Sequence, residues 1–151
     1  MVYIASDHRG YNLKEFLKGY LSQEKISFKD VGNHKFDPED DYPDFAFKLA
    51  REVAKNSNEN LGVMICGSGL GMAVAANKVK GIRAGLAVSE WFAEHGRKND
   101  DLNVLSLAAD KTDFSAAERI LKAFLGARFS QDKKYARRLE KIKKIEEEVF
   151  R

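Results

Sequence analysis

The chain has 151 residues, of which 44% are hydrophobic and 32% are charged, and its formal net charge is +3. These values predict one globular domain over residues 1–151, and the mild charge suits a small anionic substrate but is too weak to indicate nucleic acid. We expect neither a signal peptide nor a membrane span, because no basic leader precedes the first apolar run and no run approaches ~20 apolar residues. A single cysteine excludes an intrachain disulfide and fits a reducing, cytoplasmic location.

Short β-rich runs alternate with longer amphipathic segments along the chain. Strands are predicted at Val2–Ala5, Ile26–Val31, Leu61–Ile65, Arg83–Val88 and Asn103–Leu107. Helices are predicted at Asn12–Gln23, Pro43–Lys55, Leu70–Lys78, Glu90–Lys98 and Asp113–Leu125. The first helix shows the pattern best, since its apolar residues form one stripe: Leu13, Phe16, Leu17, Tyr20 and Leu21. The alternation predicts a doubly wound α/β domain with five parallel strands and helices on both faces.

The character of the chain changes after Gly126, where residues 131–151 become highly charged. Apolar residues recur there every three to four positions: Tyr135, Leu139, Ile142, Ile145 and Val149. This spacing predicts an amphipathic tail helix with a narrow apolar stripe. Such a helix needs a surface to lie on, either on its own domain or on a neighbouring subunit.

The third predicted strand ends in the chain's only cysteine, Cys66, and three alternating glycines follow: Gly67, Gly69 and Gly71. A strand that stops in a glycine-rich turn opening a helix presents backbone N–H groups to an anion, either a phosphate or an oxyanion formed during a reaction. The thiolate form of a cysteine is favoured at such a place. A base beside an oxyanion hole is what proton abstraction alpha to a carbonyl requires. The alternative is a buried cysteine before a tight turn, because free cysteine is among the most buried residue types.

Ligands in open parallel sheets bind beyond the carboxyl ends of the strands. The polar residues predicted to meet there follow the first three strands: Asp7, His8, Asp41, Tyr42, Cys66 and Ser68. Their convergence depends on the fold and not on local composition, which favours a functional interpretation.

Other motifs are absent or incomplete. Met72 stands where a dinucleotide fingerprint needs its third glycine, and Ser68 lacks the Gly-x-Ser-x-Gly frame of a hydrolase. The three histidines show no metal-ligand spacing with one another or with the cysteine, so we expect neither metal nor cofactor. The basic residues of 133–144 alternate with acids and apolar residues, which favours a solvated helix face over a nucleic-acid contact.

Several co-linear motifs resemble those of the ribose-5-phosphate isomerase B family, which includes galactose-6-phosphate and allose-6-phosphate isomerases. They are Ala5-Ser6-Asp7-His8-Arg9-Gly10, Asp41-Tyr42-Pro43-Asp44-Phe45-Ala46, Ile65-Cys66-Gly67-Ser68-Gly69-Leu70-Gly71, Ala75-Ala76-Asn77-Lys78, Gly81-Ile82-Arg83-Ala84, Asn103-Val104-Leu105, and a basic tail with Lys134 and Arg138. The resemblance implies a three-layer Rossmann-like sandwich with a charged C-terminal helix. It also implies a homodimer or a dimer of dimers with shared active sites, and metal-free interconversion of a phosphorylated aldose and its ketose.

The same resemblance implies a cis-enediolate mechanism and assigns its residues. The base in this family is a cysteine at the position of Cys66 or a glutamate six residues later, which here is Met72, so Cys66 is the candidate base. Ser68 would assist proton transfer between the substrate oxygens. The loop amides that would hold these oxygens belong to Gly67, Gly69, Leu70 and Gly71.

Further residues would bind the substrate. Asp7 would take part in catalysis with Cys66 and Ser68 by contacting sugar hydroxyls. His8 would bind phosphate or the ring oxygen, and Tyr42 would line the pocket. Lys134 and Arg138 would clamp the phosphate, on the substrate of a neighbouring subunit. Without the resemblance, these two residues indicate a plain salt-bridging surface.

The chain departs from the family pattern in three places. The family carries His-Asn before the fifth strand, with the histidine opening the furanose ring, whereas the aligned residues here are Asn99 and Asp100. Both are expected to contact substrate, but asparagine cannot act as a general acid or base near neutral pH. His95, one helical turn earlier, is a possible substitute. Asp110 stands in place of a family arginine, which removes a possible phosphate contact. Lys134 stands in place of another arginine, and this replacement keeps the charge but loses the bidentate geometry.

Three functions follow from these residues. Isomerisation of ribose 5-phosphate ranks first, with ring opening by His95, by Asp100 or spontaneously. The second is isomerisation of another sugar phosphate, such as a tetrose phosphate that cannot close a furanose, or a hexose phosphate. The third is a non-catalytic sugar-phosphate-binding protein, although binding alone does not need a thiol.

Overall fold

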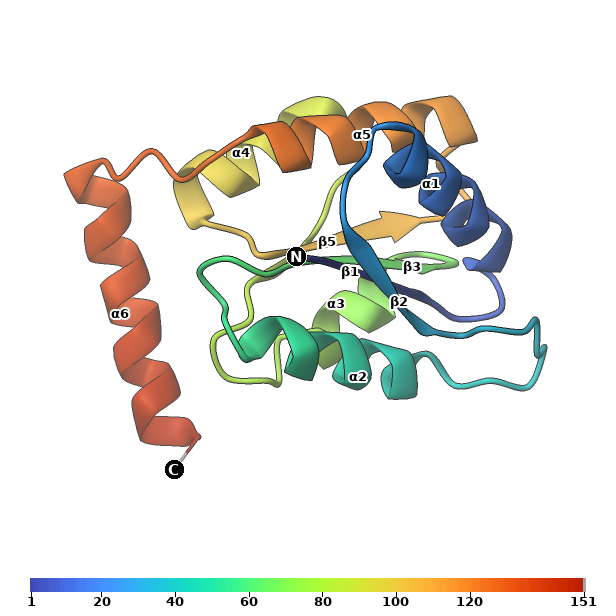
Figure 1. The fold of residues 1–151 in the computed structure, drawn as a ribbon. Coiled ribbons are helices and arrows are strands. Elements are labelled where there is room, and N and C mark those ends of the chain that lie inside the picture. The colour runs from blue at the N-terminus through green and yellow to red at the C-terminus, as the bar shows by residue number, and fades with distance from the viewer. Residues whose placement is uncertain (151) are drawn as a thin grey trace.

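The computed structural model describes residues 1–150, which form a three-layer α/β sandwich (Figure 1). Five parallel strands make one sheet in the order β2-β1-β3-β5-β4, and their bounds are β1 Val2–Ser6, β2 Phe28–Gly32, β3 Leu61–Cys66, β4 Ala84–Leu86 and β5 Val104–Ala108. The helices are α1 Tyr11–Gln23, α2 Tyr42–Ala54, α3 Leu70–Ala76, α4 Glu90–Asp100, α5 Phe114–Gly126 and α6 Lys133–Val149. The predicted five-stranded, doubly wound fold and its charged C-terminal helix are confirmed.

Helices cover both faces of the sheet, with α1, α4 and α5 on one face and α2 and α3 on the other (Figure 1). Side chains alternate between the faces along each strand. Ile65 joins the core under α1 and α5, while its neighbours Met64 and Cys66 join the core under α2 and α3. The strands are therefore buried on both sides, and Cys66 belongs to the layer of α2 and α3.

Most element ends differ from the predictions by one or two residues, and two of these differences have a clear local cause. Helix α3 ends at Ala76 because the Asn77 amide pairs in both directions with the backbone of Ala84, at 2.9 and 2.8 Å. Helix α4 continues to Asp100, where Asp101 adopts a left-handed conformation with φ of 46° that ends the helix. Strand β4 is shorter than Arg83–Val88, and it lies at the edge of the sheet beside β5.

Because all five strands are parallel, their carboxyl ends lie along one side of the sheet and their amino ends along the other. We call these two sides the carboxyl edge and the amino edge, as distinct from the edge strands β2 and β4. The strands end at the carboxyl edge, where the loops 7–10, 33–41, 67–69 and 109–113 lie. At the opposite, amino edge, helix α6 stands apart from the sandwich (Figure 1). No residue of α6 from Lys133 to Val149 is buried. No helix within residues 1–150 is long and apolar enough to cross a membrane.

Candidate active site

The loop between β3 and α3 closes over the only cysteine. Cys66 ends β3 and is 5% exposed, and the N–H of Gly69 donates a hydrogen bond to its Sγ at 3.1 Å. The hydroxyl of Ser68 accepts from the N–H of Leu70 at 3.3 Å. From β5, Ser106 Oγ donates to the carbonyl of Gly69 at 2.6 Å, which pins the turn. The loop thus places a backbone N–H on the sulfur and the Ser68 hydroxyl close to it in the chain.

Two glycines are required for this loop to form. Gly69 has a φ of +72°, and a Cβ there would lie 3.0 Å from the backbone of Leu107. A Cβ on Gly71 would lie 2.8 Å from the ring of Tyr42, the first residue of α2. The absence of side chains thus lets Tyr42 rest against the loop, with 41% of the residue exposed to a ligand. Tyr42 therefore lies beside the thiol loop, and its role in lining a substrate pocket stays a prediction.

The loop 7–10 lies directly on the end of β3. The N–H of Asp7 donates to the carbonyl of Ile65 at 3.3 Å, and a Cβ on Gly10 would collide with the same carbonyl. Asp7 is 5% exposed, and its Oδ1 accepts from the N–H of Gly10 at 3.0 Å. Burial raises the pKa of Asp7 above its ordinary value, against this hydrogen bond. The carboxyl group therefore lies beside the thiol loop at a desolvated position.

His8 is held by a residue of another loop. Both its backbone N–H and its Nδ1 contact Asp40 Oδ1, at 3.0 and 2.7 Å. The side-chain hydrogen bond to Asp40 raises the pKa of His8 above its ordinary value. With Nδ1 engaged, Nε2 is the ring nitrogen left for a ligand, and 28% of the side chain is exposed.

Arg9 is a further residue of this edge that the sequence analysis did not single out. A Cβ on Gly67 would lie 2.5 Å from the guanidinium carbon of Arg9, so the cation lies over the first glycine of the loop. Arg9 also pairs with Asp110, whose backbone N–H donates to the Gly67 carbonyl at 3.0 Å. The sequence held one signal for this pair: Arg9 and Asp110 have opposite charges, and they follow β1 and β5, the two strands that flank β3.

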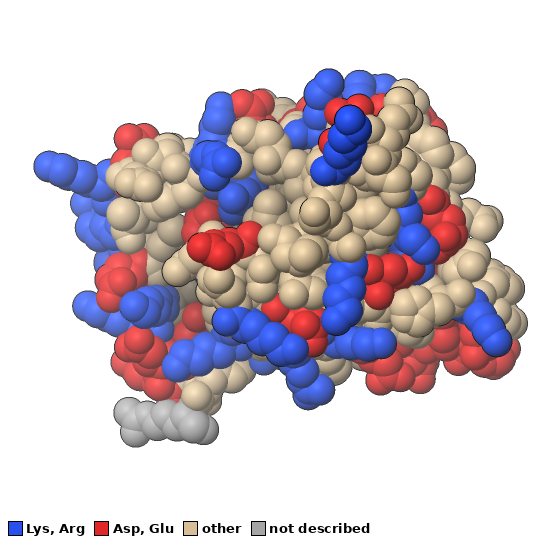
Figure 2. Space-filling model, in the orientation of Figure 1, with Lys and Arg blue, Asp and Glu red and all other residues tan. Residues whose placement is uncertain are grey.

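The remaining predicted site residues lie at the amino edge, and the structure does not bring them to Cys66 within one chain. Helix α4 runs back from the carboxyl edge, so Asn99 and Asp100 end at the opposite side of the sheet (Figure 1). Lys134 and Arg138 are exposed on α6 and flank the ring of Tyr135, at 4.7 and 5.7 Å from its centroid. Figure 2 shows basic side chains projecting along α6, with acidic ones between them.

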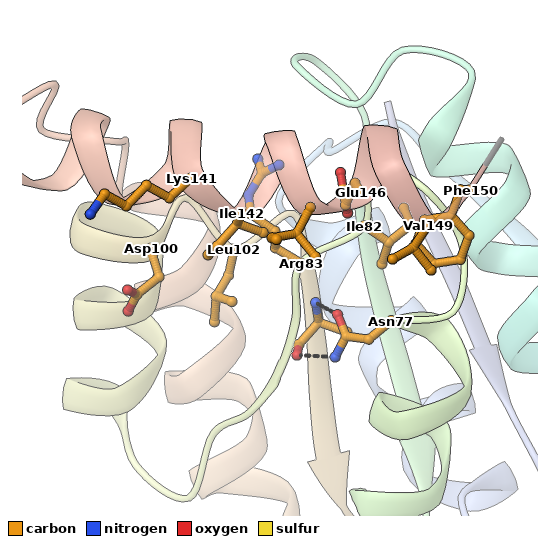
Figure 3. A pocket seen from close by; sticks show the side chains of 12 residues that line it. Asn77, Ile82, Arg83, Asp100, Leu102, Lys141, Ile142, Glu146, Val149 and Phe150 are labelled. Carbon is orange, nitrogen blue, oxygen red and sulfur yellow. Dashed lines mark hydrogen bonds between the residues drawn. The ribbon is translucent and has the colours of Figure 1, made fainter.

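Helix α6 leaves a gap between itself and the amino edge. A pocket of about 610 Å³ lies there, with Asp100 and Leu102 on one side and Ile142, Ile145 and Val149 on the other (Figure 3). The carboxylate of Glu146 reaches the N–H of Gly81 at 3.3 Å. The apolar stripe of α6 thus faces its own domain without filling the space in between.

His95 lies close to Asn99 on α4. The amide nitrogen of Asn99 is 3.0 Å from a ring nitrogen of His95, and the imidazole stacks on Trp91 with ring centroids 4.4 Å apart. Together with Glu94 and Lys98, these residues line a small pocket of about 190 Å³. Among residues 1–150, no three His, Cys, Asp or Glu side chains are grouped so as to hold a metal ion.

The fold and this geometry define the class of the protein: a doubly wound α/β domain with a thiol beside an amide-lined loop at the carboxyl ends of its strands, where sheets of this kind bind their ligands. A family model described as Ribose/Galactose Isomerase matches residues 2–142. The chain belongs to this family of isomerases.

Individual relatives match over nearly the whole chain. It is 44% identical over 148 residues to a probable ribose-5-phosphate isomerase B of Mycoplasma genitalium, covering 98% of this chain and 97% of the relative. The crystal structure of ribose-5-phosphate isomerase B from Mycoplasma genitalium with bound ribulose-5-phosphate superimposes with a TM-score of 0.95 at 43% identity, covering 98% of this chain and 97% of that one. The enzyme of Clostridium thermocellum gives a TM-score of 0.92 at 37% identity, with 97% of each chain covered.

Proposed function

We propose that this chain interconverts ribose 5-phosphate and ribulose 5-phosphate through a cis-enediolate, with Cys66 as the base. The observation that carries the proposal is the thiol at the end of β3 beneath the amides of the loop 67–69, with the Gly69 N–H 3.1 Å from the sulfur. The chain is an aldose–ketose isomerase by family, and a relative of 43% identity binds ribulose-5-phosphate. A thiol base has to stay reduced, which supports a cytoplasmic location.

The reaction moves two protons and needs no redox partner. The Cys66 thiolate takes the proton from C2 of the open-chain aldose, the C2–H electrons form the C1–C2 double bond, and the carbonyl pair moves to O1. The amides of Gly67, Gly69, Leu70 and Gly71 stabilise the negative oxygen. The Cys66 thiol then returns the proton to C1 while the O2 hydroxyl proton passes to O1, with the Ser68 hydroxyl between the oxygens. Asp7 binds sugar hydroxyls and Tyr42 lines the pocket.

The phosphate is held by cations from both edges of the sheet. His8 and Arg9 lie at the carboxyl edge of the same chain, while Lys134 and Arg138 come from the α6 helix of a second copy. Their separation from Cys66 within one chain supports a shared site, because a clamp at the amino edge serves no substrate of its own subunit. Asn99 and Asp100 reach the substrate in the same way.

Exposed apolar side chains mark where the second copy binds. They lie on α3, after β4 and at the start of α4: Leu70, Val74, Val88, Trp91 and Phe92. The first of these begins α3 directly after the thiol loop, and β4, which the group flanks, is an edge strand of the sheet. Exposed apolar side chains beside an edge strand are typical of a subunit interface. We assign a homodimer, or a dimer of dimers, to this face.

Ring opening falls to His95 in this proposal. The imidazole lies within 3.0 Å of the Asn99 amide, so it reaches the place where the family carries its histidine. The absence of a histidine at position 99 favours a second candidate, a tetrose phosphate that cannot close a furanose. That candidate predicts a much higher kcat/KM for erythrose 4-phosphate than for ribose 5-phosphate.

The decisive test is proton NMR in D₂O with the native chain and the Cys66→Ala variant. We expect deuterium to enter C1 of ribulose 5-phosphate during isomerisation of ribose 5-phosphate, and we expect the variant to show neither exchange nor turnover. Faster turnover of erythrose 4-phosphate than of ribose 5-phosphate would transfer the proposal to the tetrose. If the chain binds these tetrose, pentose and hexose phosphates but exchanges no proton in any of them, catalysis is contradicted.

Shared sites have their own test. The Cys66→Ala chain and a Lys134→Ala/Arg138→Ala chain are each expected to be nearly inactive at low substrate concentration. Subunit exchange between them should restore about a quarter of native activity, because half of random dimers are mixed and each mixed dimer holds one intact site. Light scattering checks that a dimer is present. A dimer whose mixed form stays inactive would contradict the exchange of α6 between subunits.

A further inference from the structure

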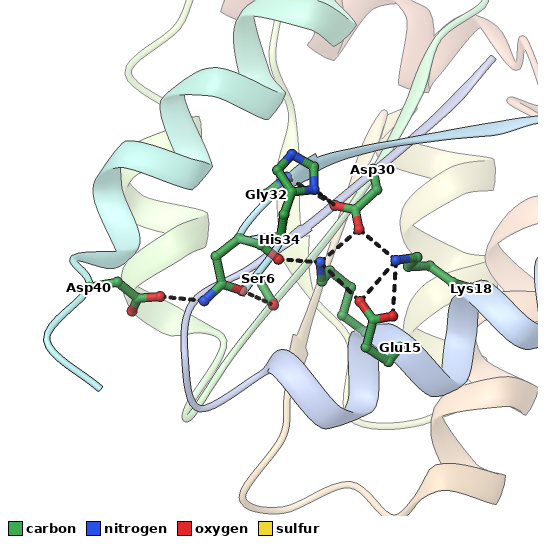
Figure 4. Close-up of polar contacts among 9 residues, drawn as sticks. Ser6, Glu15, Lys18, Asp30, Gly32, His34 and Asp40 are labelled. Atoms are coloured by element: carbon green, nitrogen blue, oxygen red, sulfur yellow. Dashed lines mark hydrogen bonds and ion pairs between the residues drawn. The ribbon is translucent and has the colours of Figure 1, made fainter. Parts of the chain in front are cut away.

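A chain of buried polar groups begins at Lys14, which is fully buried on α1. Its Nζ donates to Asp30 Oδ2 at 2.8 Å and to the carbonyl of Asn33 at 2.5 Å (Figure 4). Burial by itself raises the pKa of Asp30, but hydrogen bonds from Lys14 and Lys18 outweigh it and lower the pKa below its ordinary value. Asp30 therefore stays ionised, and the lysine anchors the first residue of the loop 33–41.

Asn33 extends the chain of contacts toward the active site. Its Nδ2 donates to Asp40 Oδ2 at 2.6 Å, and its Oδ1 lies 3.4 Å from the Ser6 hydroxyl (Figure 4). The other oxygen of Asp40, Oδ1, accepts from the backbone N–H and from Nδ1 of His8. Both carboxylate oxygens of Asp40 are thus engaged, and its side chain is only 7% exposed. A residue so constrained leaves its partner little freedom.

We propose that Asp40 is a positioning residue of the isomerase site, which fixes the ring of His8 with its proton on Nδ1 so that a charged Nε2–H faces the substrate's phosphate or ring oxygen. The inference rests on the proposed function for the identity of that ligand. Asn33 and Lys14 fix Asp40 in turn. The loop 33–41 thereby contributes to substrate binding without touching the substrate through this carboxylate.

Asp40 dominates the charges that surround His8. Asp7 and Arg9 flank the imidazole from its own loop with opposite charges, and Phe36 packs edge-on to the ring from the loop 33–41, with centroids 6.5 Å apart. The Asp40 side chain makes the hydrogen bond that most favours the imidazolium. Removing its charge while keeping its shape separates the electrostatic role of Asp40 from its steric one.

The test compares Asp40→Asn with Asp40→Ala and with a control, Asp37→Asn. Asparagine keeps an acceptor for Nδ1 and loses the charge, so the pH at which KM for ribose 5-phosphate begins to rise should be lower in Asp40→Asn than in the native chain. Asp40→Ala loses the orientation too, so its KM should exceed the native value at every pH. In each variant kcat should stay within about threefold, because the loss concerns binding. The control changes the same charge on the same loop without contacting His8.

Imidazole NMR provides a readout that does not depend on activity. The chain has three histidines, so the His8 signal is assignable by comparison with His8→Asn, and the other two serve as internal references. The titration midpoint of His8 should fall in Asp40→Asn and stay at the native value in Asp37→Asn. An unchanged midpoint together with an unchanged KM profile would overturn the inference. Failure of the native chain to isomerise ribose 5-phosphate would instead reject the proposed function, while the NMR titration still decides whether Asp40 controls His8.

Discussion

The two edges of the sheet differ in how far a single chain completes them. At the carboxyl edge, four loops are joined to one another by hydrogen bonds, as where Ala109 donates to the carbonyl of Cys66 at 2.9 Å. At the amino edge, α6 presents Lys134 and Arg138 to solvent and leaves a pocket of about 610 Å³ beneath its apolar stripe. In the proposed function, one edge is a preorganised site for chemistry and the other is half of a site. On this proposal the molecule separates proton transfer, which needs rigidity, from anion capture, which a second subunit can supply.

The largest effect is expected from the thiol, and it tests whether the carboxyl edge alone carries the chemistry. Cys66→Ala should lower kcat by about 10²–10⁴-fold, the range for loss of a general base, with KM changed little. The matched control is Met72→Leu, which conserves volume at a fully buried position and should leave kcat within about twofold. Steady-state kinetics with ribose 5-phosphate measures both. A kcat that falls in Met72→Leu and not in Cys66→Ala would move the chemistry away from the thiol.

The next effect concerns the support of the carboxyl edge. Lys14→Met removes the cation from a fully buried position and leaves Asp30 and the Asn33 carbonyl with one partner fewer. We expect a loss of about 3 kcal/mol of unfolding free energy, as for a broken buried ion pair. Lys18→Met is the matched control, because Lys18 also contacts Asp30 at 2.8 Å but is 26% exposed, and it should cost under about 1 kcal/mol. Urea unfolding of the two variants measures the difference, and equal losses would show that burial of Lys14 is not what matters.

Much of the carboxyl edge could be predicted from the sequence, because it depends on short-range pattern. Strand, glycine turn and helix fix where Cys66 and Ser68 lie, and parallel strands bring Asp7 and Tyr42 to the same edge. The partners that set the chemistry could not be predicted in this way. Asp40 reaches His8 across 32 residues, and Arg9 reaches Asp110 across 101. Such pairs depend on loop conformation, which leaves no periodic signal.

The amino edge was harder to predict for a different physical reason. The spacing of Ile142 and Ile145 identifies an amphipathic helix, yet periodicity does not say what surface covers its stripe. The apolar spacing of the tail helix is equally consistent with packing on its own domain and with packing on another copy. Asn99 and Asp100 present the same difficulty, since α4 carries them away from the thiol of their own chain. The proposed dimer would bring these residues to the thiol of the other copy.

Removal of the two proposed phosphate-binding cations of α6 tests the amino edge directly. Lys134→Ala/Arg138→Ala should raise KM for ribose 5-phosphate by about 30-fold with kcat nearly unchanged, because charged hydrogen bonds to phosphate contribute to ground-state and transition-state binding alike. Arg137→Ala, an exposed neighbour on the same helix, should change KM by less than about twofold. Kinetics at several salt concentrations checks the charge dependence. If KM rises as much in Arg137→Ala as in Lys134→Ala/Arg138→Ala, the effect is due to the general positive charge of α6, and a specific phosphate clamp is contradicted.

The smallest expected effect is on stability at the carboxyl edge, and it shows what that edge gives up for its chemistry. The pKa of Asp7 is raised by burial, so ionising the carboxyl costs the folded chain more than the unfolded one. That cost is absent below the unfolded value, about pH 4, and is fully present above the raised folded value. Asp7→Asn keeps an acceptor for the Gly10 N–H and removes the charge, so it should raise the unfolding free energy at neutral pH by less than about 1 kcal/mol.

The same variant separates stability from activity. The stability gain of Asp7→Asn should shrink as the pH falls below the raised folded pKa, and it should disappear below about pH 4, where the native carboxyl becomes protonated in both states. Activity should move in the opposite direction, because asparagine no longer offers a carboxylate to the sugar hydroxyls. Urea unfolding across pH, together with kcat/KM at neutral pH, measures both. If Asp7→Asn is less stable than the native chain at neutral pH, the hydrogen bond from Gly10 outweighs the desolvation of the Asp7 carboxylate. The carboxylate that is proposed to bind the sugar hydroxyls would then also stabilise the carboxyl edge.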